Sequence, residues 1–332
     1  MSTALIETRP QGLYCPPGDF YIDPWRGVSC AVITHAHGDH ARWGSQLYHT
    51  SAAGEPLIKI RLGEVNTQTH EWGEPFEING VRVSLHPAGH ILGSAQVRLE
   101  YQGQVWVFTG DYKRAPDPSC EPFEVVPCDT LVTEATFALP VYRWPPGDLV
   151  ADQILSWWQD NASQQRTSVL LCYSLGKAQR ILAHLSSLTD QKVYLHGAAV
   201  KLVQAYREAG IEMLPTQAVS EVNKGDLLPQ GLVLAPPSVA ESAWLRRFRN
   251  PSVAFASGWM SVRGIRKRRN YSQGFVMSDH ADWDELIATI QDTGAQRVLC
   301  THGRSQLLVR YLNENGIQAA ELATGFDSEG GE

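Results

Sequence analysis

The segment His35-Ala36-His37-Gly38-Asp39-His40 directly follows the apolar run Ala31-Val32-Ile33-Thr34. It places four side chains of metal-binding types within six positions. Imidazole and carboxylate groups bind Zn²⁺ and similar cations where thiolates are absent. Because the apolar run predicts a strand ending at Thr34, the segment is expected on a loop at a sheet edge. Its spacing indicates two adjacent metal sites and disfavours a histidine-rich surface loop without an ion.

Three further residues with metal-binding side chains follow predicted strands. His90 comes after the strand Val81 to Leu85, Asp111 ends a predicted hairpin, and His302 follows the strand Arg297 to Thr301. Loops that follow strands gather at one sheet edge, where functional side chains are often found. With the four residues of the histidine-rich loop, they supply enough ligands for two metal sites if Asp111 bridges both ions.

Strand and helix patterns differ between two regions of the chain. In the N-terminal third, alternating apolar residues on both sides of Asn79-Gly80 and of Gln102-Gly103 predict two β-hairpins. From about Leu149, helices and strands alternate, as in the strand Ser168 to Tyr173 and the helix Lys177 to Leu188. The sequence therefore predicts an α/β protein with a separate α/β module.

Length and composition restrict the class of protein. A chain of 332 residues with 19% charged residues predicts a folded protein of one large or two ordinary domains. There is no signal-peptide pattern and no run of about 20 apolar residues, so a cytoplasmic protein without membrane contact is expected. The six cysteines form no Cys-x-x-Cys pair, which disfavours a disulfide framework. Motifs of nucleotide-binding loops and serine hydrolases are absent.

Charge is distributed unevenly along the chain. The formal net charge is -7, yet Ser242 to Ser278 contains eight basic residues and no acidic residue, which leaves -15 for the remainder. Such a block is typical of a surface that contacts a phosphate backbone, and Trp259 and Tyr271 nearby could stack on bases. A solvated charged loop is the alternative interpretation. The basic residues are Arg246, Arg247, Arg249, Arg263, Arg266, Lys267, Arg268 and Arg269.

The motifs resemble those of a known superfamily. Asp23, the loop 35–40, His90 and Asp111 are similar to the successive motifs of the metallo-β-lactamase superfamily. Glu134, His280 and His302 resemble the three further motifs of its β-CASP branch, which contains nucleases that process nucleic acids. The segments Leu13 to Phe20, Tyr173 to Arg180 and Ser257 to Trp259 are similar to those of the bacterial ligase-associated DNA exonucleases.

This resemblance implies a fold and a metal centre. The fold would be α/β: a metallo-β-lactamase αββα sandwich formed by residues 1–139 and 251–332, with a β-CASP α/β cap domain inserted at residues 140–250. Two Zn²⁺ ions are implied per chain, with Mn²⁺ as the alternative ion. Asp111 would bridge the ions, and Asp23 would orient the ligand loop. One ion would bind His35, His37 and His90, and the other Asp39, His40 and His302.

The resemblance also implies an activity. It points to zinc-dependent hydrolysis of phosphodiesters, as a 5'-phosphate-dependent DNA exonuclease that digests 5' to 3' in DNA repair, with a DNA ligase or helicase as partner. Asp39, Glu134 and His280 would be catalytic, with His280 as a general acid whose pKa the Glu134 carboxylate raises. A terminal phosphate would bind at the strand-to-helix junction of Ser174 and Lys177. Ser257, Gly258 and Arg263 are further candidates for phosphate binding.

Three alternatives remain open at this point. An RNA-processing ribonuclease, similar to RNase J or to the nuclease of mRNA 3'-end processing, is favoured by His302, which RNA-directed members have. A small-molecule hydrolase would share the metal motif but would have no use for the inserted module, Glu134 or His280. A non-catalytic nucleic-acid-binding scaffold is disfavoured by the complete set of ligands.

Overall fold

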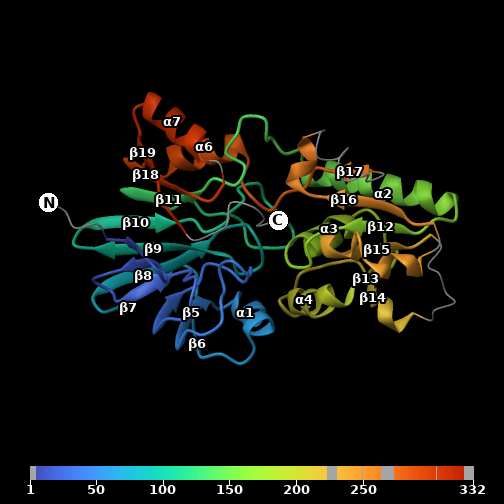
Figure 1. Ribbon diagram of the computed structural model, residues 1–332, viewed down its shortest axis with the longest axis horizontal. Helices are drawn as coiled ribbons and strands as arrows, with labels where there is room; N and C mark the ends of the chain where they lie inside the picture. The colour runs from blue at the N-terminus through green and yellow to red at the C-terminus, as the bar shows by residue number, and fades with distance from the viewer. Residues whose placement is uncertain (1–4, 223–229, 249, 263–272, 304, 325–332) are drawn as a thin grey trace. The chain divides into compact units, whose positions relative to one another are not determined.

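The computed structural model describes residues 5–222, 230–248, 250–262, 273–303 and 305–324 (Figure 1). The chain divides into two compact units. The first unit comprises Met1–Pro116, Cys120–Tyr142 and His280–Gly331, and the second comprises Asp117–Ser119 and Arg143–Asp279. The second unit is therefore an insertion in the sequence of the first.

The first unit contains two sheets. The six-stranded sheet has the order β1-β2-β3-β4-β5-β6, and α1 (Glu55–Leu62) lies beside β5 and β6 in Figure 1. The seven-stranded sheet has the order β19-β18-β11-β10-β9-β8-β7. The six-stranded sheet is formed by β1 (Glu7–Arg9), β2 (Gly12–Cys15), β3 (Phe20–Ile22), β4 (Cys30–Val32), β5 (Leu47–Ser51) and β6 (Thr67–His70). The other is formed by β7 (Phe76–Ile78), β8 (Val81–Pro87), β9 (Ala95–Tyr101), β10 (Gln104–Phe108), β11 (Thr130–Glu134), β18 (Arg297–Thr301) and β19 (Gln318–Glu321).

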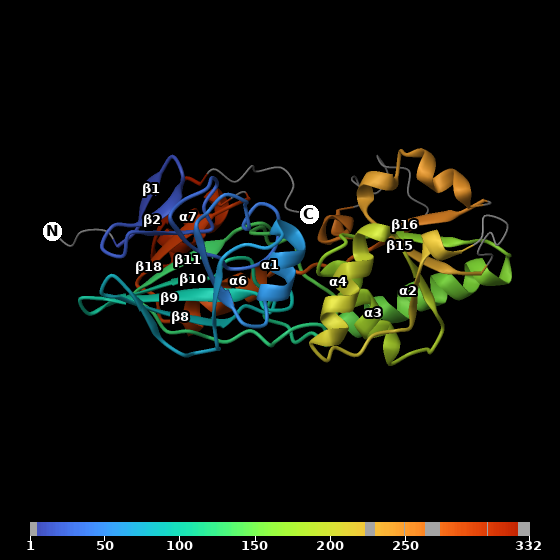
Figure 2. The ribbon, with the colours of Figure 1, turned by 90° about the horizontal axis from the view of Figure 1, so that it is seen from below.

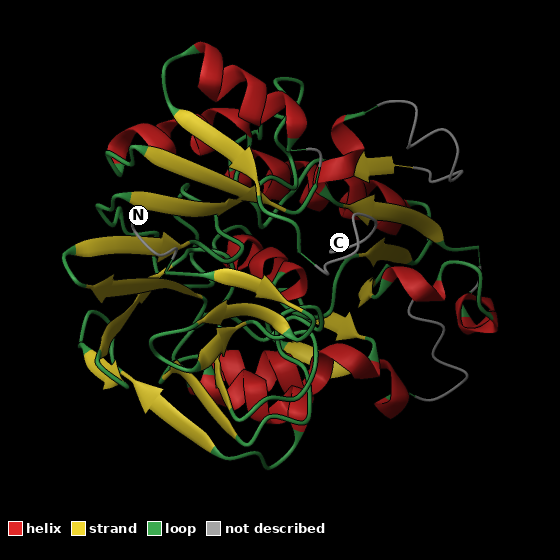
Figure 3. Ribbon diagram, turned by 60° about the vertical axis from the view of Figure 1, so that its left-hand side comes forward, coloured by secondary structure: helices red, strands yellow, loops and turns green. Residues whose placement is uncertain are grey.

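Two apolar cores hold the layers of the first unit together. Between the sheets, side chains such as Phe20 and Val32 pack against Leu85 and Val97. On the other face of the seven-stranded sheet, alternate residues of β10, β11 and β18 pack against α6 (Trp283–Asp292) and α7 (Gln306–Glu314). Figures 2 and 3 show these sheets and helices from two further directions. This arrangement confirms the predicted αββα sandwich.

The second unit is an α/β module with one parallel sheet. Its strand order is β14-β13-β15-β12-β16-β17, and all of its strand pairs are parallel. One face packs against α2 (Gly147–Ser163), α3 (Lys177–Ser186) and α4 (Gly197–Glu208), and the other carries a separate core around Val169 and Phe255. The strands are β12 (Ser168–Leu171), β13 (Val193–Leu195), β14 (Thr216–Ala218), β15 (Leu232–Ala235), β16 (Ser252–Ala256) and β17 (Gln273–Phe275).

The extent of the inserted module differs from the sequence-based boundary at residue 250. β16 pairs with β12, and β17 pairs with β16, so both strands belong to the module's sheet, and the second unit extends to Asp279. The apolar run of β16 gives no local sign of which sheet it joins, because only its pairing partners decide this. In the described ranges, no helix is both long and apolar enough to span a membrane.

Candidate metal centre

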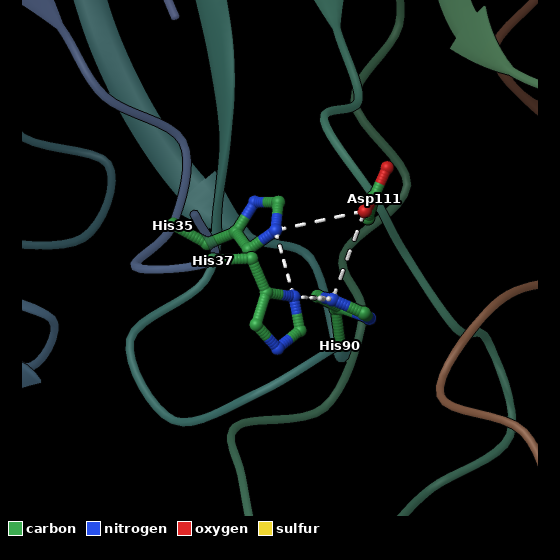
Figure 4. Close-up of side chains that lie close together, drawn as sticks. All are labelled: His35, His37, His90 and Asp111. Atoms are coloured by element: carbon green, nitrogen blue, oxygen red, sulfur yellow. Dashed lines mark hydrogen bonds and ion pairs between the residues drawn. The ribbon is translucent and has the colours of Figure 1, made fainter. Parts of the chain in front are cut away.

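Four side chains from distant parts of the first unit point toward one another (Figure 4). His37 Nδ1 lies 3.1 Å from His35 Nε2 and 3.0 Å from His90 Nε2. Asp111 Oδ2 lies 3.6 Å from His35 Nε2 and 3.8 Å from His90 Nε2. In a tetrahedral site with bonds of about 2.0–2.1 Å, neighbouring ligand atoms are about 3.4 Å apart. The four donor atoms therefore fit a metal ion.

A second group shares Asp111 with the first. His40, Asp111 and His302 each offer a donor atom close enough to hold an ion. His40 Nε2 lies 3.5 Å from Asp111 Oδ2 and 3.8 Å from Asp39 Oδ2. The rings of His40 and His302 are stacked with centroids 5.4 Å apart. The structure thus brings together all seven sequence-predicted ligands, with Asp111 common to both groups and Asp39 beside the second.

A third group combines Asp111 with Glu134 and His280, and all three residues are buried. His280 Nδ1 lies 2.8 Å from Glu134 Oε2, while Glu134 Oε1 accepts a hydrogen bond from the Tyr112 amide at 2.8 Å. The His280 ring lies 4.8 Å from the ring of His90. The predicted Glu134–His280 pair therefore exists, directly beside the first group.

Asp23 holds the ligand loop in place. Its Oδ1 accepts a hydrogen bond from the Thr34 amide at 2.8 Å, and its Oδ2 accepts one from the Thr34 hydroxyl at 2.6 Å. Oδ2 also lies 2.7 Å from His40 Nδ1. Because Nδ1 of His40 is occupied in this way, Nε2 is the nitrogen directed at Asp111. This is the orienting contact predicted for Asp23.

Glycine is required in two of the turns that carry ligands. Gly110, before Asp111, has φ +56°, and a Cβ there would lie 2.8 Å from the Thr34 side chain. Gly303, after His302, has φ +65°, and a Cβ there would lie 2.2 Å from the Ala135 carbonyl oxygen. A side chain at either position would strain the backbone and displace a ligand.

One residue of the centre was missed by the sequence analysis. Arg61, at the end of α1, donates a hydrogen bond from Nε to the carbonyl oxygen of Ala36, within the ligand loop. A Cβ on Gly38 would lie 2.8 Å from the Arg61 guanidinium, so the loop is shaped around this side chain. The sequence carries no local signal for the contact, because 25 positions separate the two residues.

Burial and charge act together on the titratable groups of the centre. Burial lowers the pKa of His35 well below its usual value, with His40 and His90 adding to the effect. Burial likewise lowers the pKa of His302 to about 4. Burial opposes ionisation of Asp111, but the positive charges of protonated His40 and His280 hold its pKa well below the usual range. Burial opposes protonation of His40, but Asp111 and Asp23 raise its pKa well above the usual value. Metal ions bind neutral imidazole and ionised carboxylate, so a metal ion at the second group would displace a proton from His40.

Glu134 behaves differently from Asp111. Burial raises the pKa of Glu134, and the negative charge of Asp111 adds to this increase, while His280 opposes it. The surroundings thus raise the pKa of Glu134 and lower the pKa of Asp111. Such a separation is typical of sites that perform acid and base chemistry.

The structure contradicts one expected phosphate ligand. Lys177 is fully buried, and its Nζ lies 2.5 Å from Asp279 Oδ1 and donates to the Met277 carbonyl at 3.0 Å. Its charge is already compensated by a buried carboxylate, so its expected role as a cation for a terminal phosphate is corrected. At the same junction, the Gly176 amide donates to the Gln179 side chain at 2.7 Å, and Ser174 is partly exposed.

Two further expected phosphate ligands, Ser257 and Gly258, also lie in the second unit. Ser257 is fully buried, and its hydroxyl accepts a hydrogen bond from the Trp259 amide at the start of the short helix Gly258–Ser261. Gly258 is buried as well. These positions favour a capping role for Ser257. Arg263 lies outside the described residues, as do Arg249, Arg266, Lys267, Arg268, Arg269 and Tyr271 of the basic block.

A two-sheet sandwich with a histidine and aspartate centre defines a protein of the metallo-β-lactamase fold. A solved structure of a protein of unknown function from Enterococcus faecalis has a similar fold, with a TM-score of 0.59 and 12% identity over 90% of this chain and 79% of that one. No family model matches the chain.

Three relatives narrow this class. The chain is 31% identical over 322 residues to a "Probable DNA ligase" of Opitutus terrae, covering 96% of this chain and 31% of that protein. It is 21% identical to an "RNase J-like protein" of Methanocaldococcus jannaschii over 54% of this chain and 50% of that protein. It is 29% identical to "Cleavage and polyadenylation specificity factor 73" of Drosophila melanogaster over 39% of this chain and 19% of that protein. The chain thus spans half or less of the length of these relatives.

The chain belongs to the β-CASP nuclease family of the metallo-β-lactamase fold, as the resemblance of its motifs implied.

Proposed function

We propose that the chain is a metal-dependent nuclease that hydrolyses phosphodiester bonds of nucleic acid. One observation carries the proposal: Asp111 joins two groups of possible metal ligands and a buried Glu134–His280 pair. Phosphodiester hydrolysis needs an activated nucleophile, stabilisation of negative charge and a proton for the leaving oxygen. The three groups place residues suited to all three tasks within one centre.

The donor set supports two Zn²⁺ ions, with Mn²⁺ as the alternative ion. His35, His37, His90 and Asp111 would hold one ion, and Asp39, His40, His302 and Asp111 the other. When bound, a pair of such ions supplies Lewis-acid stabilisation and an activated water. Asp23 and Arg61 keep the ligand loop in position through their contacts with Thr34 and Ala36.

Glu134 and His280 would provide the proton. The carboxylate holds His280 Nδ1 at 2.8 Å and so fixes the orientation of the ring. The imidazole would then donate a proton from its other nitrogen to the leaving 3'-oxygen. Among the catalytic residues, Asp39 acts through metal binding, whereas His280 acts through proton transfer.

An exposed tryptophan near the ligands favours nucleic acid over a small molecule. Trp43 lies three residues after His40 and is 75% exposed. The buried Tyr48 hydroxyl fixes the backbone on both sides of it, by donating to the Arg42 carbonyl at 2.9 Å and accepting from the Ser45 amide at 2.8 Å. An exposed indole on a fixed backbone is a surface on which a nucleobase can stack.

DNA is the proposed substrate, with 5' to 3' exonuclease action on 5'-phosphorylated ends in DNA repair. The segments similar to ligase-associated exonucleases support it, as does the "Probable DNA ligase" relative that aligns with 96% of the chain. A DNA ligase or helicase is the proposed partner. RNA processing is the second candidate, because other relatives are named "Endoribonuclease YSH1" and "RNase J-like protein".

Metal analysis and end-labelled substrates test the proposal together. Elemental analysis of the purified chain should find two zinc ions, and 5'-phosphorylated DNA should be digested faster than RNA of the same sequence. Asp39→Ala should lower metal content and hydrolysis together. Asp129→Ala serves as control, because the Asp129 carboxylate accepts a hydrogen bond from the Val105 amide and belongs to none of the ligand groups. Preferential digestion of RNA would establish the second candidate, and full activity of Asp39→Ala would refute the metal assignment.

A further inference from the structure

Helix α3 carries two buried cations one turn apart. Lys177 and Arg180 have exposed fractions of 0% and 2%. Removing a charged side chain from water is costly unless ion pairs and hydrogen bonds compensate for it. The partners of these cations therefore indicate what their burial achieves.

Both cations hold the same short segment of the chain. Lys177 Nζ lies 2.5 Å from Asp279 Oδ1 and donates to the Met277 carbonyl at 3.0 Å. Arg180 Nη1 donates to the Ser278 carbonyl at 2.7 Å and lies 3.4 Å from Asp279 Oδ1. Three consecutive residues, Met277 to Asp279, are thus fixed to α3 through their backbone or side chains. The next residue in the chain is His280.

Arg180 has a second acidic partner. Its Nε lies 2.7 Å from Asp117 Oδ2, which also lies 3.1 Å from His184 Nε2. Asp117 Oδ1 in turn accepts a hydrogen bond from the Ser119 amide at 2.9 Å. The guanidinium is therefore held on two sides, which limits the positions it can take when it binds the Ser278 carbonyl.

We propose that Lys177 and Arg180 are positioning residues for His280. They fix the backbone of the three residues that precede His280, whose imidazole Nδ1 lies 2.8 Å from Glu134 Oε2. The inference rests on the proposed nuclease function, and it assigns part of the support of His280 to residues outside the ligand groups. Misplacement of a reacting group by about 1 Å costs on the order of 100-fold in rate.

Lys177→Met tests the inference, because it removes the charge and keeps most of the volume. We expect kcat on DNA to fall about 10- to 100-fold, with KM and bound metal unchanged. An aryl phosphodiester such as bis(p-nitrophenyl) phosphate has a leaving group that needs no proton, so its hydrolysis should change less than about twofold. Arg207→Met is the matched control, since Arg207 of α4 binds the Leu214 carbonyl at 2.7 Å and should tolerate the change.

A double-mutant cycle separates positioning from direct action on substrate. In a His280→Ala background, Lys177→Met should cause no further loss on DNA. An additional loss of 10-fold or more in that background would overturn the inference. If Lys177→Met does not fold, the nearly isosteric Asp279→Asn is measured in the same way, with the same expected results.

Failure of the inference can be distinguished from failure of the proposed function. If His280→Ala lowers kcat on DNA but Lys177→Met and Asp279→Asn do not, His280 is the acid and the positioning role is refuted. If His280→Ala itself leaves DNA hydrolysis unchanged, the acid role assigned in the proposed function fails, and the inference fails with it.

Discussion

Asp23 stabilises the metal centre through three contacts with the ligand loop. Its carboxylate accepts two hydrogen bonds from Thr34 and lies 2.7 Å from His40 Nδ1. In Asp23→Asn, the amide group can replace one oxygen but cannot accept at the other position. We expect metal affinity to fall about 10- to 100-fold, the range typical of residues that orient a ligand. Competition with a chromophoric chelator measures the change.

The control for this prediction is Asp19→Asn. Asp19 also lies in the first unit, accepts a hydrogen bond from the Tyr14 hydroxyl at 2.7 Å and belongs to none of the ligand groups. Its metal affinity should equal that of the unchanged chain. Equal affinities for all three proteins would show that Asp23 does not orient His40.

Trp43 gives a second prediction at the scale of a single residue. Stacking of a base on an aromatic ring contributes about 1–3 kcal/mol, so Trp43→Ala should weaken binding of single-stranded DNA about 5- to 150-fold. Fluorescence anisotropy with a labelled oligonucleotide in the presence of a chelator measures binding without cleavage. Leu307→Ala removes another exposed apolar side chain, 52% exposed on α7, and should leave the affinity unchanged. Unchanged affinity in Trp43→Ala would exclude stacking there.

At the scale of elements, α3 makes the stability of the second unit depend on pH. Burial opposes ionisation of Asp117, but Arg180 and His184 hold its pKa below the ordinary value of 3.8. Burial opposes protonation of His184, but Asp117 raises its pKa above the ordinary value of 6.5. The Asp117 contribution is present above pH 3.8 and is lost as pH falls through its folded pKa. The His184 contribution is present below pH 6.5 and is lost as pH rises through its folded pKa.

Asp117→Asn should remove the Asp117 contribution and reduce the His184 contribution, because His184 Nδ1 keeps its contact with Asp148 Oδ1 at 2.8 Å. The difference in melting temperature between the unchanged chain and this variant should therefore be largest between about pH 4 and 6.5, and should narrow on both sides of that range. Thermal unfolding followed at pH 3 to 9 measures the difference. Asp160→Asn changes an exposed carboxylate on α2 and serves as control. A difference in melting temperature that is constant with pH would contradict the coupling of stability to the protonation of Asp117 and His184.

Elements of the fold could be predicted from the sequence where a few neighbouring residues determine them. The Asn79-Gly80 turn joins β7 to β8, and both of its residues have the positive φ that such a turn requires. Asp282 and Glu285 have the spacing of a capping box, another local pattern, and Asp282 accepts a hydrogen bond from the Glu285 amide at 3.0 Å at the start of α6. The membership of β16 in the second sheet could not be predicted, because it depends on pairing with β12 far away in the sequence.

At the scale of the whole molecule, the metal ligands could be predicted from the sequence, but the residues that hold the ligand loop and other segments in place could not. The spacing of His35 to His40 indicates metal binding by residue type alone. By contrast, the contact of Arg61 with Ala36 and the burial of Lys177 against Asp279 depend on how α1 and α3 pack. A lysine at a strand-to-helix junction has the same local pattern whether it binds phosphate or a buried carboxylate. Only the folded chain distinguishes these two cases.

Removal of the metal ions should lower the stability of the first unit only. The ligand groups come from the segments that follow β4, β8, β10 and β18, and in the described part of the chain no residue of the second unit belongs to them. Because bound metal stabilises by about 2.7 kcal/mol at a concentration of 100 Kd, chelation should lower hydrogen-exchange protection in these segments by up to about 100-fold. Protection of β12, β13 and β15 should stay unchanged, since their hydrogen bonds form a separate sheet. An equal loss of protection in that sheet would show that the metal centre supports the fold of both units.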